Sequence, residues 1–190
     1  MGLQRQLALN FYQSDMSSSI TFPVRHATLR DAKAIADLYS TALREAFKDT
    51  VADDILAKVA LEKGQGFWRE AIEYSEPHVQ VALNGEKIVG FVGYDRSRDP
   101  KTPNTMGEIW AIYAAPDYWG LGVGLALWDA AREGLQEEGC TNVSVWVPLG
   151  NERVVRFHEL AGFKRELNTA KTVPFGSVKI EEIRLKRTVN

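Results

Sequence analysis

The 190-residue sequence predicts a single α/β (α+β) domain in which helices pack against a mixed central sheet. Three observations lead to this fold class. Strand-like and helix-like patterns alternate from residue 20 onward, an Asn84-Gly85 pair marks a hairpin, and a glycine-rich turn follows a strand and opens a helix. The order of about seven strands and about four helices is β, α, α, β, β, β, α, β, α, β, β, which differs from the regular βαβ repetition of a doubly wound fold.

The first elements are a short strand and two helical segments. Residues 21–27 are β-prone, and Thr28 and Asp31 then supply capping side chains for a helix over 32–47. Apolar residues of that helix recur on one face, as in a helix that packs on a sheet. A second helical segment covers 53–74, although two glycines near its middle interrupt it, because glycine is a poor helix former.

The middle of the chain contains a hairpin and a third strand. Asn84-Gly85 is a strong hairpin signal because both residues tolerate a positive φ angle. The polar, proline-containing stretch 96–105 is predicted to be a loop. The three strands of this part span 79–83, 87–94 and 108–115.

Regular alternation assigns the side chains of the third of these strands to two faces. A bulge would change this assignment beyond its position. On a regular strand, Glu108, Trp110, Ile112 and Ala114 share one face, and Ile109, Ala111 and Tyr113 share the other.

A helix over 125–138 follows the glycine-rich turn and ends at Gly139, a residue that suits the position just after a helix. The remaining elements are short. A strand spans 142–147, a helix spans 152–160, and two strands span 163–167 and 178–186.

Composition argues against several functional classes. The formal net charge of −2 leaves no cationic surplus for phosphates, so no nucleic-acid partner is expected. No apolar run approaches the ~20 residues that a membrane span needs, so no membrane partner is expected either. The single cysteine, Cys140, cannot form an intrachain disulfide, and together with only three histidines it argues against a Cys/His zinc site. We therefore expect a soluble, cytoplasmic protein without a metal site.

The first 19 residues differ from the domain predicted over 20–190. Leu3, Leu7 and Phe11 recur at helical spacing, but a run of serines follows them. The stretch lacks the unbroken apolar core and the cleavage site of a secretory signal. We expect an N-terminal arm over 1–19 that is mobile or loosely docked.

The glycine-rich turn runs from Trp119 to Ala126 and carries glycines at alternate positions, Gly120, Gly122 and Gly124. Glycine lets backbone N–H groups converge because no Cβ blocks the approach of a ligand. The helix that follows adds its own unpaired N–H groups and the positive end of its dipole. The turn is therefore a candidate cradle for a phosphate or a diphosphate.

Two common phosphate motifs do not fit this turn. The dinucleotide fingerprint requires a glycine where Leu125 or Leu127 stands, and the nucleotide-triphosphate loop requires a lysine that is missing here. A tight strand-to-helix turn, with glycines for packing alone, is the alternative interpretation.

Two segments of the sequence carry a family resemblance. The first is Glu108-Ile-Trp-Ala-Ile-Tyr-Ala-Ala-Pro116 followed by Trp119-Gly-Leu-Gly-Val-Gly124, and the second is Asn151-Glu-Arg-Val-Val-Arg-Phe157-His158-Glu-Leu-Ala-Gly162-Phe163. In sequence and in the spacing between them, they resemble the two signature motifs of the GCN5-related N-acetyltransferases. The resemblance extends from about residue 21 to residue 186.

This resemblance implies the acyl-CoA N-acyltransferase fold, with a mostly antiparallel sheet. It also implies that acetyl-CoA donates an acetyl group to a primary amine of a small molecule or peptide, by direct transfer in a ternary complex. Homodimers are common in the family, so a homodimer is left open. The residues implied in coenzyme binding are Ile112, Tyr113, Ala114, Trp119, Gly120, Leu121, Gly122, Val123, Gly124, Leu125, Asn151 and His158.

Acetyl transfer to an amine needs a base for the amine proton and an acid for the leaving thiolate. The resemblance places the base at Glu108, a residue that is equally typical of a solvated strand end. The family usually has tyrosine where this chain has His158, and an imidazole can also donate a proton. His158 is therefore a candidate acid, or a helix-surface residue that only contacts the coenzyme. Asn151 is also a good N-cap for its short helix.

Two departures from the family pattern leave other functions open. The family usually has Arg or Gln at the position of Trp119, so one side-chain contact to phosphate is lost, and His158 replaces the usual tyrosine. A non-catalytic acyl-CoA-binding or sensing module is therefore an alternative to the enzyme, and a nucleotide-binding regulatory domain is a further one. Arg153 and Arg156 could reach phosphates, or they could be solvated surface charges.

Overall fold

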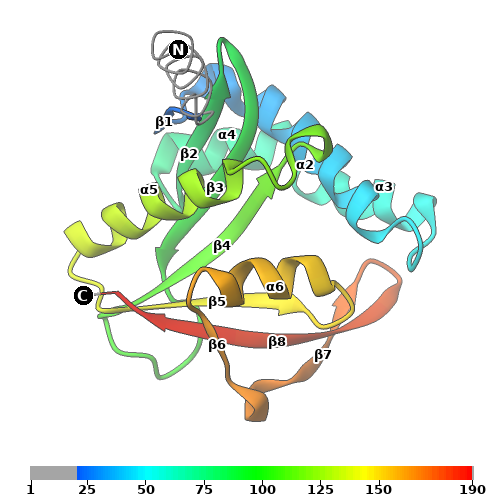
Figure 1. The fold of residues 1–190 in the computed structure, drawn as a ribbon. Coiled ribbons are helices and arrows are strands. Elements are labelled where there is room, and N and C mark those ends of the chain that lie inside the picture. Colours follow the sequence, from blue (N-terminus) through cyan, green and yellow to red (C-terminus); the bar gives the residue numbers. More distant parts are fainter. Residues whose placement is uncertain (1–20, 190) are drawn as a thin grey trace, which may run out of the picture.

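The computed structural model describes residues 21–189. These residues form one eight-stranded, mostly antiparallel sheet with helices on both faces, so the predicted fold class is confirmed (Figure 1). The arm predicted over 1–19 lies outside the described residues.

The elements have the following bounds. The strands are β1 (Val24–His26), β2 (His78–Asn84), β3 (Lys87–Arg96), β4 (Met106–Ala114), β5 (Asn142–Pro148), β6 (Lys164–Arg165), β7 (Lys171–Phe175) and β8 (Val178–Thr188). The helices are α2 (Ala32–Phe47), α3 (Asp53–Glu62), α4 (Gln65–Tyr74), α5 (Val123–Glu137) and α6 (Glu152–Leu160). Short 3₁₀ turns are η1 (Leu29–Asp31), η2 (Pro116–Tyr118) and η3 (Leu167–Thr169).

The strand order is β1-β2-β3-β4-β5-β8-β6, and β7 pairs with β8. The neighbouring strands are antiparallel, except for the parallel pair of β4 and β5. That parallel pairing ends at Ile109 and Val145, whereas β4 continues to Ala114 and β5 to Pro148. The two strands therefore separate, and within residues 21–189 the rest of β4 has no strand neighbour on this side.

The helices form two layers around the sheet. Helices α5 and α6 lie on one face, whereas α2 and α4 lie on the other with α3 beside α2 (Figure 1). Each layer has its own hydrophobic core. Leu127 and Trp128 of α5 belong to the first core, and Ile35, Trp68 and Phe91 belong to the second. The separation of β4 and β5 opens between these layers.

Strand β4 contains a bulge at Trp110, because the pairing with β3 skips this residue. Ile109 packs in the core beneath α5 together with Ile112, whereas Ala111 and Tyr113 pack in the core on the α2 face. The predicted grouping of Ile109 with Ala111 and Tyr113 was therefore wrong. The extra residue shifts the alternation of side chains by one, which a regular strand does not allow for.

The predicted helix over 53–74 consists of two helices, α3 and α4. The break falls at Gly64, which has extended backbone as the N-cap of α4, whereas Gly66 lies inside α4. Thr28 and Asp31 form a reciprocal capping box on η1, immediately before α2. The predicted capping residues are thus used, but on the 3₁₀ turn that leads into the helix.

The C-terminal strands differ most from the prediction. Strand β6 has only 2 residues, and the strand β7, which the sequence pattern did not predict, pairs with β8 as a hairpin. Pro174 lies within β7. Because β7 pairs with β8 on one side only, a residue without an N–H group is tolerated there. Proline normally argues against a strand, and it obscured this one.

Candidate functional site

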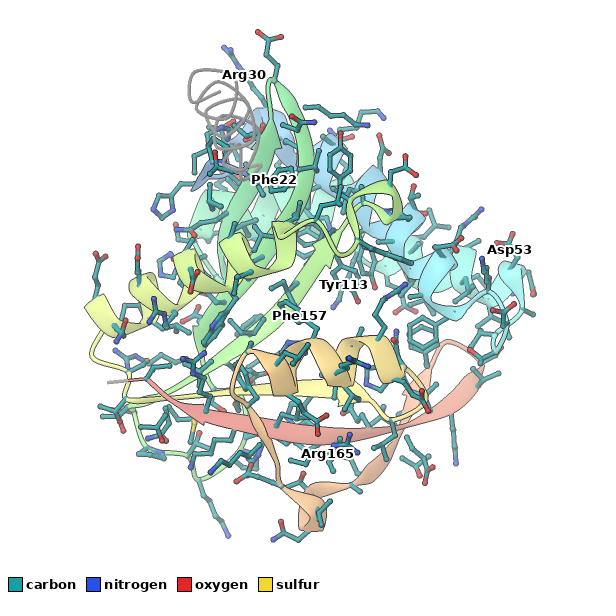
Figure 2. All side chains as sticks on the ribbon, in the orientation of Figure 1. Phe22, Arg30, Asp53, Tyr113, Phe157 and Arg165 are labelled. Carbon is teal, nitrogen blue, oxygen red and sulfur yellow. The ribbon has the colours of Figure 1, made fainter. Side chains whose placement is uncertain are left out.

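A cavity of about 530 Å³ lies where β4 and β5 separate. Its walls include residues 109–114 of β4 and 145–148 of β5. The loop after β4, the first turn of α5, the helix α6 and the C-terminal end of α2 complete the lining. Tyr113 from β4 and Phe157 from α6 both line the cavity, although they come from different layers (Figure 2). The cavity is therefore assembled by the topology of the sheet.

The glycines of the loop between β4 and α5 have two different roles. Gly120 and Gly122 have φ angles of 77° and 100°, and a Cβ on either would meet no heavy atom within 4 Å. Their role is therefore conformational, because side chains disfavour this backbone region. A Cβ on Gly124 would lie 3.0 Å from the ring of Phe157, so this glycine allows α6 to approach α5. The packing interpretation thus holds for Gly124 but not for the other two.

The first turn of α5 presents free backbone donors at the cavity. Gly122 is the N-cap of α5, and no side chain caps this helix. The first hydrogen bond of the helix runs from Ala126 N–H to the carbonyl of Gly122. Among residues 21–189, the N–H groups of Val123, Gly124 and Leu125 have no hydrogen-bond acceptor. Such a cluster at a helix N-terminus favours a bound anion.

The side chain of Trp119 bridges this loop and the open edge of β4. Its Nε1–H donates to the carbonyl oxygen of Ala114 at 2.9 Å. The Arg153 guanidinium carbon, from the first turn of α6, lies 3.1 Å from the centroid of the Trp119 ring. Burial lowers the pKa of Arg153, and the carboxylate of Glu45 acts in the opposite direction. Trp119 and Arg153 thus join the two walls of the cavity.

The free edge of β4 offers backbone groups to a ligand. The Ala115 N–H donates to Val89 of β3, so the polar groups of Ile112 and Ala114 point to the opposite side, away from β3. That side faces the separation from β5, where the parallel ladder has ended. Trp119 uses the carbonyl of Ala114, which leaves the Ala114 N–H and both polar groups of Ile112 available to a ligand in the described part of the chain.

His158 lines the cavity as a buried, neutral imidazole. Its Nδ1 lies 2.9 Å from the carbonyl oxygen of Val154, so the proton of the neutral ring is at Nδ1 and Nε2 carries a lone pair. The ring makes edge contacts with Phe157 and Phe163. Burial lowers the pKa of His158 to about 4, and the hydrogen bond to Val154 acts in the opposite direction. At neutral pH the Nε2 atom of this cavity-lining residue is therefore a hydrogen-bond acceptor.

Glu108 lies at the base of the separation and does not line the cavity. The residue is 1% exposed. Its Oε2 accepts a hydrogen bond from the backbone N–H of Arg98 at 2.8 Å, and its Oε1 is ion-paired with the guanidinium of the same residue. The Arg98 guanidinium also lies 4.1 Å from the centroid of the Trp110 ring. The loop before β4 therefore holds this carboxylate in place.

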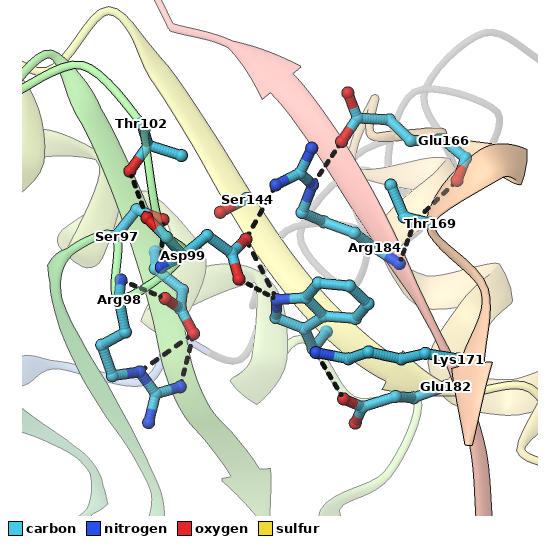
Figure 3. Close-up of polar contacts among 12 residues, drawn as sticks. Ser97, Arg98, Asp99, Thr102, Ser144, Glu166, Thr169, Lys171, Glu182 and Arg184 are labelled. Atoms are coloured by element: carbon cyan, nitrogen blue, oxygen red, sulfur yellow. Dashed lines mark hydrogen bonds and ion pairs between the residues drawn. The ribbon is translucent and has the colours of Figure 1, made fainter. Parts of the chain in front are cut away.

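A second set of polar contacts fixes the same loop to β5 and β8 (Figure 3). The carboxylate of Asp99 accepts from the indole Nε1–H of Trp146 at 3.1 Å and from Arg184 at 2.8 Å. Arg184 also donates to Glu166 at 2.5 Å. Trp146 lines the cavity, so this network orients one of its walls.

Most of the predicted coenzyme-binding residues come together. Leu121 is exposed and Val123 is a core side chain, so neither side chain lines the cavity. Asn151 caps α6 through its side chain, which accepts from the Val154 N–H at 3.2 Å, and it also lines the cavity. The predicted residues that line the cavity are Ile112, Tyr113, Ala114, Trp119, Gly120, Gly122, Gly124, Leu125, Asn151 and His158.

The sequence reasoning missed Ala42 and Ala46, through which α2 contributes to the cavity wall. Ala42, Ala46 and Phe47 line the cavity, and Phe47 packs against Phe175 of β7 with ring centroids 5.0 Å apart. The apolar face of α2 was visible in the sequence, but it indicated only that the helix packs on something. The side chain of Trp146 was missed for a similar reason, because an aromatic residue in a strand is ordinary.

Two features, a metal site and a membrane-spanning helix, are not seen among residues 21–189. No group of three or more His, Cys, Asp or Glu side chains is arranged to hold a metal ion. In the same residues, no helix combines the length and the apolar character that crossing a bilayer demands.

Comparison with known proteins identifies a family whose model matches this chain. The model of the acetyltransferase (GNAT) family matches residues 33–163, which is more than half of the chain. A mycothiol acetyltransferase of Propionibacterium freudenreichii subsp. shermanii is 42% identical over 57 residues, which are 30% of this chain and 18% of that protein. The curated relatives are matched over 18% to 62% of their own length, so the chain spans less than two thirds of each.

Solved structures share the fold at low sequence identity. The PaiA N-acetyltransferase from Thermoplasma acidophilum, in complex with coenzyme A, is similar with a TM-score of 0.73 and 13% identity, over 89% of this chain and 99% of that one. The yncA protein of Salmonella typhimurium, solved with its cofactor acetyl-CoA, gives a TM-score of 0.65 and 20% identity, over 89% of this chain and 94% of that one.

Proposed function

The chain belongs to the acetyltransferase (GNAT) family, and we propose that it is an acetyl-CoA-dependent N-acetyltransferase. The acceptor is a primary amine of a small molecule or peptide, and the acetyl group passes to it directly in a ternary complex. The observation that supports this most strongly is a continuous cavity between the free N–H groups of α5 and the unpaired edge of β4. A diphosphate needs donors such as the N–H groups of α5, and an amide-containing arm needs donors and acceptors such as those at the edge of β4.

The described residues fit coenzyme A in three respects. The turn at Gly120 and Gly122 has open space where side chains would stand, so an anion can approach the backbone. The polar groups of Ile112 can pair with the pantetheine amides as an added strand would. The remainder of the cavity, bounded by Phe47 and Trp146, is apolar and can accept the acyl end and part of the acceptor.

Acetyl-CoA supplies the acetyl group as a thioester, and the chain must remove one proton from the ammonium form of the acceptor before attack. We assign this step to Glu108. Its Oε2 accepts only the Arg98 N–H among the described residues, so lone pairs are left for a water molecule. Because Glu108 does not line the cavity, the proton reaches it through water rather than directly.

His158 is assigned the second proton transfer. As the new N–C bond forms and the C–S bond breaks, the nitrogen must lose a proton and the sulfur must gain one. The lone pair of Nε2 can receive the proton from nitrogen and pass it to sulfur, while Nδ1–H stays bonded to Val154. The pKa of about 4 makes the transient imidazolium a strong acid, which releases the proton readily to the thiolate.

The decisive experiment is incubation of the purified protein with acetyl-CoA and a panel of primary amines that includes polyamines, amino acids, aminoglycosides and peptides. Free thiol is measured over time, and the acetylated product is identified by mass spectrometry. We expect release of thiol above the background of hydrolysis with at least one class of amine, together with a product that is heavier by one acetyl group.

One observation favours a non-catalytic acyl-CoA-binding or sensing module as a second candidate. Glu108 is already paired with Arg98, and His158 is already bonded to Val154. Binding of coenzyme A without thiol release from any amine would support this candidate. Stabilisation by ATP or NAD, but not by coenzyme A, would contradict both candidates and support a nucleotide-binding domain.

A further inference from the structure

We propose that Arg153, stacked on Trp119, binds the diphosphate of coenzyme A together with the backbone N–H groups at the start of α5. This inference rests on the proposed use of coenzyme A by this cavity. It adds a charged residue to a phosphate site that otherwise consists of backbone dipoles, and it gives Trp119 a role as the platform for that charge.

The position of the guanidinium is the first argument. Its carbon lies 3.1 Å from the centroid of the Trp119 ring, and both residues line the cavity. Stacking uses the flat face of the guanidinium and leaves the N–H groups at its edge free to bind an oxyanion. Among residues 21–189, Arg153 donates to no carboxylate or carbonyl, in contrast to Arg98 and Arg184, which are ion-paired.

The platform itself is fixed beside the phosphate cradle. The indole Nε1–H of Trp119 donates to Ala114 at 2.9 Å, and the backbone N–H of Trp119 donates to Pro116 at 3.1 Å. Trp119 directly precedes Gly120, so a cation on its ring lies next to the glycine turn. Two hydrogen bonds that involve no phosphate therefore fix the Trp119 ring beside the cradle, and Arg153 stacks on this ring.

The charges around the cavity are the second argument. Among residues 21–189, no Asp or Glu belongs to its lining, whereas Arg153 and Arg156 both do. Glu45, whose charge acts on Arg153, lies outside the lining. A diphosphate is a dianion, and a charge-assisted bond to guanidinium is stronger than a bond to a neutral donor. Of these two arginines, Arg153 is the one held by an aromatic ring, so its side chain is ordered before the ligand arrives and loses less conformational freedom on binding.

The test compares the dissociation constants of three ligands for purified protein. Coenzyme A carries the diphosphate and a 3′-phosphate, dephospho-coenzyme A lacks the 3′-phosphate, and pantetheine lacks all phosphates. Calorimetry serves the first two ligands, and ligand-detected NMR at millimolar concentration serves pantetheine. The variants are Arg153→Ala, Arg153→Lys and the control Arg165→Ala, which removes an equal charge that is paired with Glu159 outside the cavity.

We expect Arg153→Ala to weaken coenzyme A and dephospho-coenzyme A by about tenfold each, as the loss of a charge-assisted bond predicts, and to leave pantetheine unchanged. Arg153→Lys keeps the charge but cannot stack as a flat group, so a smaller loss is expected. Arg165→Ala should change none of the three constants.

Several results would overturn the inference. Binding of coenzyme A by Arg153→Ala within twofold of the unmodified chain excludes a phosphate contact, and the proposed function then stands. An equal loss for pantetheine indicates damage to the cavity, and a loss confined to coenzyme A assigns Arg153 to the 3′-phosphate. If the unmodified chain binds no coenzyme A at all, the proposed function itself fails.

Discussion

Arg98 engages both carboxylate oxygens of Glu108, one through its backbone N–H at 2.8 Å and the other through its guanidinium. The two residues are 10 positions apart and belong to the loop before β4 and to β4 itself. Glu108 is 1% exposed, so the interpretation as a solvated residue at a strand end does not hold. Its carboxylate is removed from water, and the Arg98 guanidinium compensates its charge. The loop thereby supplies the counter-charge that allows a carboxylate to be buried beneath the cavity.

Removal of this counter-charge should destabilise the fold. We expect Arg98→Ala to lower the free energy of unfolding by about 2 kcal/mol, because a buried carboxylate then lacks its charged partner. The value is set below the range for fully buried ion pairs because the Arg98 side chain is 52% exposed and solvent screens its charge. Urea unfolding at neutral pH measures the change. The double variant Arg98→Ala/Glu108→Gln should recover part of the loss, and an equal or larger loss in the double variant would contradict the charge explanation.

The proposed base gives a kinetic prediction for the same residue. With an acceptor identified from the amine panel, Glu108→Gln should lower kcat by about 100-fold, since general-base catalysis contributes at least this much. The KM for acetyl-CoA should stay within about twofold, because Glu108 does not line the cavity. Steady-state kinetics and melting curves of Glu108→Gln and of the unmodified chain separate this effect from unfolding. An unchanged kcat would remove Glu108 from the mechanism.

Local patterns in the sequence predicted much of the fold. The apolar stripe of α2, the hairpin at Asn84 and Gly85 and the glycine-rich turn before α5 are all properties of short segments, and each was found. A turn or an amphipathic helix depends on residues that are close in the sequence, so its signal survives without knowledge of the partners. The same locality explains why the sequence alone locates the glycine-rich turn that is the proposed phosphate cradle.

Features that depend on pairing between distant segments were not predictable. The bulge at Trp110 exists because β3 and β4 pair with a register shift, and no residue type in β4 predicts this shift. The stacking of Arg153 on Trp119 requires the loop after β4 to face α6 across the separated strands. The pairing of Arg98 with Glu108 likewise depends on how the loop before β4 folds back onto the strand. The sequence could therefore identify Glu108 as a candidate residue but could not predict its burial.

The glycine turn can be tested against a glycine elsewhere in the chain. Gly122 has a φ angle of 100°, so Gly122→Ala should lower the free energy of unfolding by about 1–2 kcal/mol and weaken coenzyme A binding. Gly66 lies inside α4, and a Cβ there would meet nothing within 4 Å. Gly66→Ala should therefore stabilise the chain by about 0.5–1 kcal/mol and leave binding unchanged. Thermal unfolding and calorimetry distinguish the two, and equal effects of both substitutions would refute the conformational role of Gly122.

His158 makes a prediction about acid sensitivity. Its pKa is lowered by burial to about 4 from an ordinary value of 6.5. Between these values the unfolded chain binds a proton that the folded chain does not, so the free energy of unfolding falls as the pH falls through this window. The contribution is fully present above about pH 6.5, and roughly 2 kcal/mol of it should be lost between pH 7 and pH 5. Urea unfolding at the two pH values measures the difference.

The matched variants are His158→Gln and His26→Gln. His26 is exposed in β1 and lies outside the cavity, so its substitution is the control for the loss of a histidine elsewhere in the chain. His158→Gln should remove most of the loss between pH 7 and pH 5, since glutamine does not titrate. It should also lower kcat if Nε2 carries the proton from nitrogen to sulfur, because the amide cannot accept and release a proton at that rate. A variant that loses the acid sensitivity but keeps the full kcat would show that His158 is a buried structural residue of α6 and not a proton carrier.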